Sequence, residues 1–321
     1  MPPLRPSLIK LLTRVPRLGG QVRELHNAWL RRRIHSYWRN GANPARARLS
    51  ADRPVLNEAQ ARVLSDLTRC GIAQIHFEEL GFDRGLWQAL LNQTQRWLES
   101  EKVRERERQY VEGNHREAKW KEYIIMMTSE EGDSFPIDCT LLQLGLHPLV
   151  LDIVNSYLGL MARLFHLDIW KTIPLSHQGP LIGSQRWHRD PEDLKLVKVF
   201  LYLNEIGADS GPLHYLKHSR RGERYGHLWP QRLPYGSVAP PEEVERQAPR
   251  SDWAVCTAPA GTFIFADTTG LHMGGRASLE QRLFATWGYA SPGTVWPRYY
   301  QLNSTGCSPE LSPAARQALF D

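Results

Sequence analysis

Apolar residues in the first half of the chain recur at helical spacing. From Asn57 onward, the apolar positions between 59 and 67 predict a helix that ends near Gly71. Three more elements are predicted in this half: a strand at 72–77, a long helix at 83–108 and a shorter helix at 148–157. The first half is therefore expected to be helical, with one early strand.

After Leu160 the apolar residues come in short runs separated by Gly and Pro, a pattern typical of β-strands. The runs are 160–170, 194–204, 212–216, 261–266 and 282–289. Their spacing and turns predict an antiparallel sandwich or jelly roll whose interior can hold a small ligand. Because the helices come first and the strands later, we expect an α+β fold with helices packed against one sheet.

The chain has no internal repeat and no low-complexity tract, which predicts one main domain at 51–321 behind an N-terminal extension at 1–50. One segment interrupts the strands: residues 220–252 are rich in Arg, Pro and Glu. A loop of this length in a compact domain is usually functional or disordered. It is expected to be either a lid over the ligand site or a solvated insertion.

The net charge of +6 is distributed unevenly along the 321 residues. Residues 1–50 contain eleven Lys or Arg and one acid, a net charge of +10, and the other 271 residues contain 29 bases and 33 acids, a net charge of −4. The basic extension is typical of a solvated arm or of contact with anionic lipid or another acidic surface. Because the main domain is mildly acidic, the charge argues against a nucleic-acid-binding body.

The four cysteines lie far apart in the sequence and form no C-x-x-C pair. They are Cys70, Cys139, Cys256 and Cys307. This usage excludes a disulfide scaffold or zinc ribbon and predicts a reducing compartment, so we expect a cytoplasmic protein. The Arg-rich N-terminus lacks the uninterrupted apolar segment of a secretory signal, and a mitochondrial-type presequence stays open as an alternative. The longest run without a charged residue, 283–297, contains two prolines, so we expect no transmembrane helix.

Histidines at metal-ligand spacing are the main chemical signal, because no Walker A loop, G-x-G-x-x-G, G-x-S-x-G or H-E-x-x-H motif occurs. On a strand, residues i and i+2 share a face, so a His and a carboxylate two positions apart can reach one metal ion. The spacing occurs four times, as His76/Glu78, His115/Glu117, His166/Asp168 and His188/Asp190. Context favours the last pair, because it leads through a short turn into the long strand at 194–204.

A third ligand is available in His272, which follows the strand at 261–267 within a Gly-rich turn. Two His and one carboxylate would form a facial triad that leaves three positions on the metal for a co-substrate and dioxygen. Ten residues later, Arg282 opens the next strand. An Arg at such a position is normally a surface residue, but beside a metal it can bind a carboxylate in bidentate fashion.

These residues carry a resemblance to a known family. With Trp187-His-Arg-Asp190, the segment 211–220, and the segment 261–272 followed by Arg282, the chain resembles the phytanoyl-CoA dioxygenase-like group of non-haem Fe(II)/2-oxoglutarate-dependent oxygenases over roughly residues 55–290. The resemblance implies a double-stranded β-helix (jelly-roll or cupin-like) core. It also implies iron held by His188, Asp190 and His272, and Arg282 bound to the distal carboxylate of 2-oxoglutarate.

One departure concerns the second anchor of that carboxylate. Many relatives place a hydroxyl residue two positions after the distal His or the Arg, and this chain has Gly274 and Phe284 there. Thr262 or Lys171 is therefore expected to supply the second contact.

The implied reaction is dioxygen-dependent hydroxylation of a C–H bond in a small or lipid-like substrate, with succinate and CO2 as co-products. Asp190 favours this oxidation over halogenation, for which relatives lack the carboxylate. Desaturation, ring closure and epimerisation use the same ligands and stay open. The alternative from another class is a non-catalytic β-sandwich that its basic arm docks to an acidic partner or a membrane.

Overall fold

The computed structural model describes residues 16–41, 43–112, 123–127, 134–174, 180–303 and 310–320. Three features of the sequence lie outside this part: the first fifteen residues of the basic extension, the His115/Glu117 pair and Cys307.

The larger sheet has six strands in the order β1-β10-β6-β12-β4-β2, and every neighbouring pair is antiparallel. The strands are β1 (Ile72–His76), β2 (Ile124–Met126), β4 (Arg163–Thr172), β6 (Val197–Tyr202), β10 (Thr262–Ala266) and β12 (Arg282–Ala290). Every run predicted as a strand contributes a strand to this sheet except 212–216, which belongs to the second sheet.

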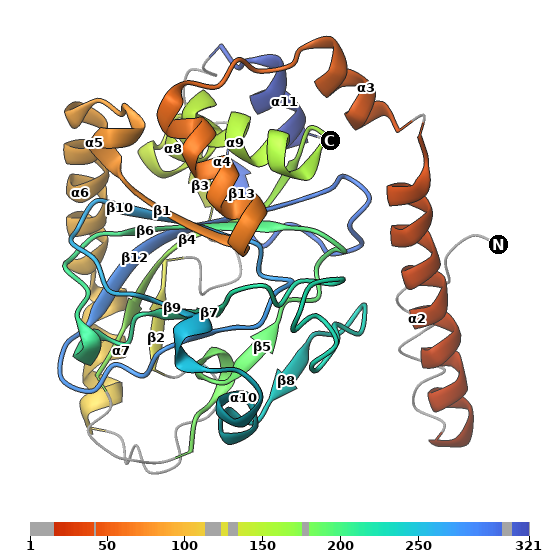
Figure 1. Cartoon of the computed structure of the whole chain (residues 1–321). Coiled ribbons are helices and arrows are strands. Elements are labelled where there is room, and N and C mark those ends of the chain that lie inside the picture. Colours follow the sequence, from red (N-terminus) through yellow and green to blue (C-terminus); the bar gives the residue numbers. More distant parts are fainter. Residues whose placement is uncertain are drawn as a thin grey trace.

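The second sheet has five shorter strands in the order β8-β5-β11-β7-β9, again antiparallel throughout. The strands are β5 (Trp187–Arg189), β7 (Leu213–Leu216), β8 (Ser237–Ala239), β9 (Trp253–Cys256) and β11 (His272–Gly274). It lies below the six-stranded sheet in Figure 1, and side chains from both sheets meet in a buried cluster between them. A separate parallel pair joins β3 (Ser134–Pro136) to β13 (Gln301–Asn303).

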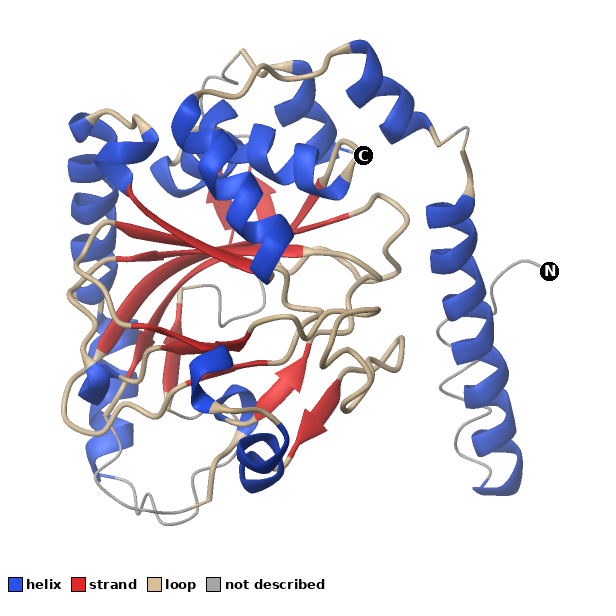
Figure 2. Ribbon diagram, viewed as in Figure 1, coloured by secondary structure: helices blue, strands red, loops and turns tan. Residues whose placement is uncertain are grey.

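Helices cover the outer face of the six-stranded sheet (Figure 2). Those on this face are α4 (Glu58–Cys70), α8 (Thr140–Leu146), α9 (Pro148–Leu158) and α11 (Pro313–Phe320). The others are α2 (Pro16–Arg39), α3 (Pro44–Ala51), α5 (Phe77–Leu80), α6 (Arg84–Leu98), α7 (Glu101–Glu112) and α10 (Pro241–Gln247). Antiparallel sheets with helices on one side confirm the expected mixture of helix and sheet.

Helix α4 shows how local sequence sets an element. Asn57 accepts a hydrogen bond from the Gln60 backbone N–H, and the Gln60 side chain accepts one from the Asn57 N–H, which satisfies two donors at the helix start. Gly71 ends the helix at φ 82°, and a Cβ there would lie 2.2 Å from the Tyr215 hydroxyl. Only glycine meets both requirements.

Strand β12 separates the packed core from the interior between the sheets. Leu283, Ala285 and Trp287 pack toward the helices in the main core, and the Trp287 indole donates to the Leu141 carbonyl of α8. Because side chains alternate along a strand, Arg282, Phe284 and Thr286 face the other way, into a cavity between the sheets. This alternation places Arg282 in the interior.

The prediction of one long helix over 83–108 is wrong, because α6 and α7 are separate helices with a break at Glu99 and Ser100. The Ser100 N–H bonds to the Trp97 carbonyl, and the Ser100 carbonyl accepts the N–H groups of Val103 and Arg104. Ser100 therefore ends one helix and begins the next.

The boundary expected at residue 50 cuts through a packed helix. Ala45 of α3 belongs to the main core, and its carbonyl accepts the Met161 N–H at 3.1 Å. In the described part of the chain, no single helix is long and apolar enough to cross a membrane, and α8 and α9 reach that length and composition only as a pair bent by 44°.

Candidate metal centre

Two neighbouring strands of the five-stranded sheet bring the histidines together. β11 pairs with β5 so that His272 lies opposite His188, and their ring centroids are 4.1 Å apart. Asp190 follows β5 directly, with its carboxylate 3.7 Å from His188 Nε2 and 3.5 Å from His272 Nε2. One ligand atom from each of the three residues lies within 4.8 Å of the others. The structure thus joins the three side chains singled out in the sequence.

Backbone carbonyls fix the orientation of both imidazoles. His188 Nδ1 lies 2.8 Å from the Arg186 carbonyl and His272 Nδ1 lies 3.1 Å from the Gly270 carbonyl. A ring nitrogen beside a carbonyl carries the proton and donates it, which leaves each Nε2 with a free lone pair directed at the shared centre. Burial lowers the pKa of His188, and burial followed by the neighbouring His188 lowers the pKa of His272 to about 3. Both rings are therefore neutral near pH 7, the form that binds metal.

The third member of the cluster, Asp190, is an ionised carboxylate. Burial opposes its ionisation, but the Lys198 ammonium lowers the pKa of Asp190 below its usual range. Lys198 Nζ on β6 lies 2.7 Å from Oδ2 as an ion pair, yet this buried oxygen has no partner in hydrogen-bond alignment. Two neutral imidazoles and one carboxylate oxygen with acceptor capacity fit a divalent iron ion.

A cavity of about 80 Å³, counted as space open to the centres of water molecules, lies between the two sheets beside this cluster. That space accommodates several water molecules or a small co-substrate. Its walls are largely aromatic, with Trp170, Phe200 and Phe284 among the lining residues. Among the described residues that line it, none comes from 220–252, so the expectation that this segment is a lid stays a prediction.

The side chain of Arg282 brings a positive charge into this cavity. The residue is 6% exposed, and its guanidinium donates to the Gly211 carbonyl and lies 4.9 Å from the centre of the Phe284 ring. Its Nε has no hydrogen-bond partner, and no carboxylate among the described residues pairs with it. Burial lowers the pKa of Arg282. A buried guanidinium without a counter-ion is suited to bind an anionic ligand.

Gly274 gives this guanidinium room. A Cβ at Gly274 would lie 3.0 Å from Arg282 Nη2, closer than ordinary contact allows. Gly274, where many relatives have a hydroxyl residue, therefore lies directly against Arg282.

Two hydroxyl groups near Arg282 were missed in the sequence. Ser184 lines the cavity, and its Oγ lies 3.0 Å from the hydroxyl of Tyr123. Burial raises the pKa of Tyr123, while Ser184 and the charge of Arg282 lower it, which places the phenol within the field of the guanidinium. Residues 123 and 184 are distant in sequence and belong to no motif, so no signal in the chain pointed to them.

Lys171 and Thr262, the two residues expected to help bind the co-substrate, do not line the cavity. Lys171 follows Trp170 on β4, and adjacent residues face opposite sides of a strand. Its ammonium pairs with Glu107 of α7 instead. Thr262 lies at the outer end of β10, paired with His76 of the edge strand β1. Neither is placed to be the second anchor.

Of the other His-x-acid pairs, two lie in the described part of the chain, and neither joins the metal cluster. His76 caps α5 by accepting the Glu78 N–H, and its Nε2 lies 3.2 Å from the Ala260 carbonyl. His166 lines the cavity from β4, but it is not part of the three-residue cluster.

No family model and no curated protein matches this chain. Among solved structures, it is similar to the epimerase SnoN in complex with Fe3+, alpha ketoglutarate and nogalamycin RO, at 16% identity and a TM-score of 0.47, covering 78% of this chain and 93% of that one. It is also similar to HygX from Streptomyces hygroscopicus with nickel, 2-oxoglutarate and hygromycin B bound, at 13% identity and a TM-score of 0.47, covering 78% of this chain and 93% of that one. A third similar structure is EctD from S. alaskensis with bound Fe, at 15% identity and a TM-score of 0.48, covering 77% of this chain and 83% of that one. Because each TM-score is below 0.5, the chemistry of the site rests on its own residues.

Proposed function

We propose that this chain is a non-haem Fe(II)/2-oxoglutarate-dependent oxygenase of the phytanoyl-CoA dioxygenase-like group that acts on a small organic molecule. One observation carries the proposal: His188, Asp190 and His272 converge beside the unpaired guanidinium of Arg282. Two antiparallel sheets that enclose such a site support the proposal that the core is the double-stranded β-helix that the sequence resemblance implies.

Each residue then has a defined task. His188 and His272 supply neutral Nε2 lone pairs and Asp190 supplies an anionic oxygen, so the protein contributes one negative charge to the metal. Arg282 neutralises the distal carboxylate of 2-oxoglutarate and sets its depth in the cavity. When bound, iron and 2-oxoglutarate supply the oxidising power, with succinate and CO2 as co-products.

The walls of the cavity control what else enters. Trp170, Phe200 and Phe284 give the space beside the metal ligands an apolar wall, which favours an organic ligand over bulk water there. The ion pair with Lys198 restricts the orientation of the Asp190 carboxylate, which would keep this side chain in position to bind the metal. We propose hydroxylation as the reaction; Asp190 disfavours halogenation because it occupies the position that a halide would need, whereas desaturation, ring closure and epimerisation use the same ligands and stay open.

Succinate formation tests the proposal without knowledge of the substrate, since such oxygenases turn over slowly with 2-oxoglutarate alone. Purified protein is incubated aerobically with Fe(II), ascorbate and 2-oxoglutarate, and succinate is measured by mass spectrometry. We expect succinate from the native chain, and none above background from His188→Ala or Asp190→Ala. Arg106→Ala on the exposed face of α7 is the control and is expected to match the native rate. Equal succinate from native protein and His188→Ala contradicts the proposal.

A further inference from the structure

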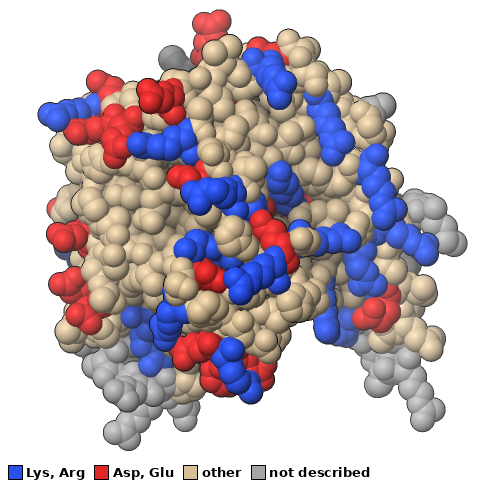
Figure 3. Space-filling view, viewed as in Figure 1, with Lys and Arg blue, Asp and Glu red and all other residues tan. Residues whose placement is uncertain are grey.

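A second, larger cavity lies outside the metal centre, between α2 and the segment 221–233. Its volume is about 530 Å³ by the same measure. The lining contains four arginines and a histidine, and no Asp or Glu: Arg31, His35, Arg189, Arg221 and Arg232. Figure 3 shows Lys and Arg side chains gathered along α2 and the part of the body beside it, with only scattered acids. We call this space the arginine cavity.

Arg189 builds the inner wall of the arginine cavity. It lies between His188 and Asp190 in sequence and is 2% exposed. Its guanidinium donates to five backbone carbonyls, those of Ser219, Tyr225, Leu228, Trp229 and Thr269. Because these bonds tie the segment 219–229 to β5, the wall is held in place by a buried cation that pairs with no carboxylate of the described residues.

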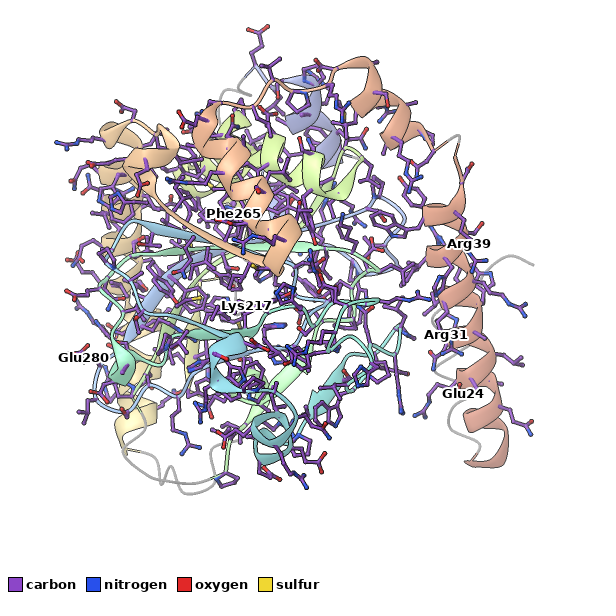
Figure 4. All side chains as sticks on the ribbon, in the orientation of Figure 1. Glu24, Arg31, Arg39, Lys217, Phe265 and Glu280 are labelled. Atoms are coloured by element: carbon purple, nitrogen blue, oxygen red, sulfur yellow. The ribbon has the colours of Figure 1, made fainter. Side chains whose placement is uncertain are left out.

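Helix α2 closes the other side through side-chain contacts with the body. Arg31 extends toward the body (Figure 4) and donates to the Leu233 carbonyl at 3.2 Å. Trp38 donates from its indole N–H to Asp193 at 2.5 Å, and Asn27 contacts the Tyr235 hydroxyl at 3.4 Å. The helix is thus fixed at several points along its length, with the arginine cavity between it and the body.

The charges around the arginine cavity are poorly compensated. Arg221 and Arg232 are exposed and make no ion pair with any described residue, and the nearest carboxylate to Arg31 is Glu24 at 3.9 Å. Burial lowers the pKa of His35, and the charges of Arg221 and Arg39 lower it further. The fold therefore holds several like charges together without neutralising them, an arrangement that a bound anion would stabilise.

We propose that the arginine cavity binds a phosphate-bearing ligand. Planar guanidinium groups bind phosphate oxygens in bidentate fashion, and Arg31, Arg221 and Arg232 offer such groups here from two separate elements. Arg189 contributes only its charge, because its five donors are bonded to carbonyls. The volume exceeds that of a single phosphate ion, so the ligand is an organic phosphate or a phospholipid headgroup. The site does not use the metal ligands, so the proposal stands apart from the proposed oxygenase activity.

One side chain connects the two sites. The Gln231 amide lines the arginine cavity and donates to the backbone carbonyls of Asp190 and Asp193 at 2.6 and 2.8 Å. An anion bound in this cavity therefore contacts the segment that holds the backbone of the metal-ligating aspartate.

Calorimetric titration of the metal-free full chain with inorganic pyrophosphate tests the site. The double variant Arg221→Gln/Arg232→Gln removes two charges from the cavity, and Arg104→Gln/Arg106→Gln removes two from the exposed face of α7 as the matched control. We expect the dissociation constant to rise at least tenfold in the first and less than twofold in the second. His188→Ala is expected to bind pyrophosphate like the native chain, which separates this result from the oxygenase proposal.

Vesicles distinguish the source of the phosphate. Flotation with phosphatidylcholine vesicles, with and without phosphatidic acid, is run on the same variants. Recovery that requires phosphatidic acid and is lost in Arg221→Gln/Arg232→Gln indicates a headgroup, whereas pyrophosphate binding without flotation indicates a soluble phosphate. Equal losses in the two double variants, or no binding of either probe to the native chain, overturns the proposal.

Discussion

Ser184 illustrates how a single hydroxyl can decide the fit of a co-substrate. It lines the cavity near Arg282 and is linked to the buried hydroxyl of Tyr123. A carboxylate held by one guanidinium can still rotate, and a second donor fixes it. We propose that Ser184 takes the role for which Thr262 and Lys171 were expected.

Ser184→Ala is expected to raise the KM for 2-oxoglutarate about tenfold, because a hydrogen bond to a charged group contributes about 1.5 kcal/mol. The maximal rate of succinate formation and the affinity for Fe(II) are expected to stay near the native values. Ser210→Ala, which removes a hydroxyl bonded to Glu280 outside the cavity, serves as the control. An unchanged KM in Ser184→Ala would contradict this role.

Cys256 provides a second test at the residue scale, because its reactivity reports whether solvent reaches the interior between the two sheets. It is fully buried on β9, and burial raises the pKa of its thiol to about 12. The thiolate is the reactive form, so the folded chain is expected to leave Cys256 unmodified by iodoacetamide at pH 8.5, whereas the unfolded chain reacts. Peptide mapping with and without 8 M urea measures this. Modification of Cys256 at equal rates in both would show that the interior opens to solvent.

At the scale of elements, the strands that carry the two metal-binding histidines are among the shortest that the structure describes. β5 and β11 have three residues each, too few for an alternating pattern to reveal them. His188, Asp190 and His272 were recognised instead from ligand spacing and family resemblance. The long strands β4, β6 and β12 were predictable because their apolar runs are continuous.

The failures in prediction follow from the same geometry. Lys171 was expected to line the cavity. Adjacent residues of a strand point to opposite faces of the sheet, so Trp170 points into the cavity and Lys171 points away from it, toward Glu107. The charge and apolar spacing predicted one continuous helix, whereas the backbone hydrogen bonds of Ser100 divide it into α6 and α7. Tyr123 and Ser184 meet only through tertiary folding, which no local pattern encodes.

The start of α4 gives a prediction at this scale. Asn57→Ala removes the side chain that accepts the Gln60 N–H, and is expected to lower the free energy of unfolding by about 1 kcal/mol. Asn57→Ser restores an acceptor and is expected to recover most of that loss. Urea unfolding followed by circular dichroism measures both. No difference between the Ala and Ser variants would show that the cap contributes little here.

Across the whole molecule, charge is divided between two sites. The cavity between the sheets holds one compact cluster in which Lys198 lies between Asp190 and Glu192. The arginine cavity outside it gathers uncompensated positive charge along α2. The sequence predicted a basic N-terminal segment, but not that α2 packs on the body and faces arginines from the segment 221–233.

The central claim is that the two histidines, Asp190 and Arg282 together bind Fe(II) and 2-oxoglutarate. Anaerobic titration of the metal-free chain with both, followed by visible absorption, tests it most directly, since the chelate of iron with 2-oxoglutarate has a weak charge-transfer band. We expect the band in the native chain, none in His188→Ala, and a far higher 2-oxoglutarate requirement in Arg282→Ala than in Arg106→Ala. A folded native chain that retains iron but shows no band would contradict the claim.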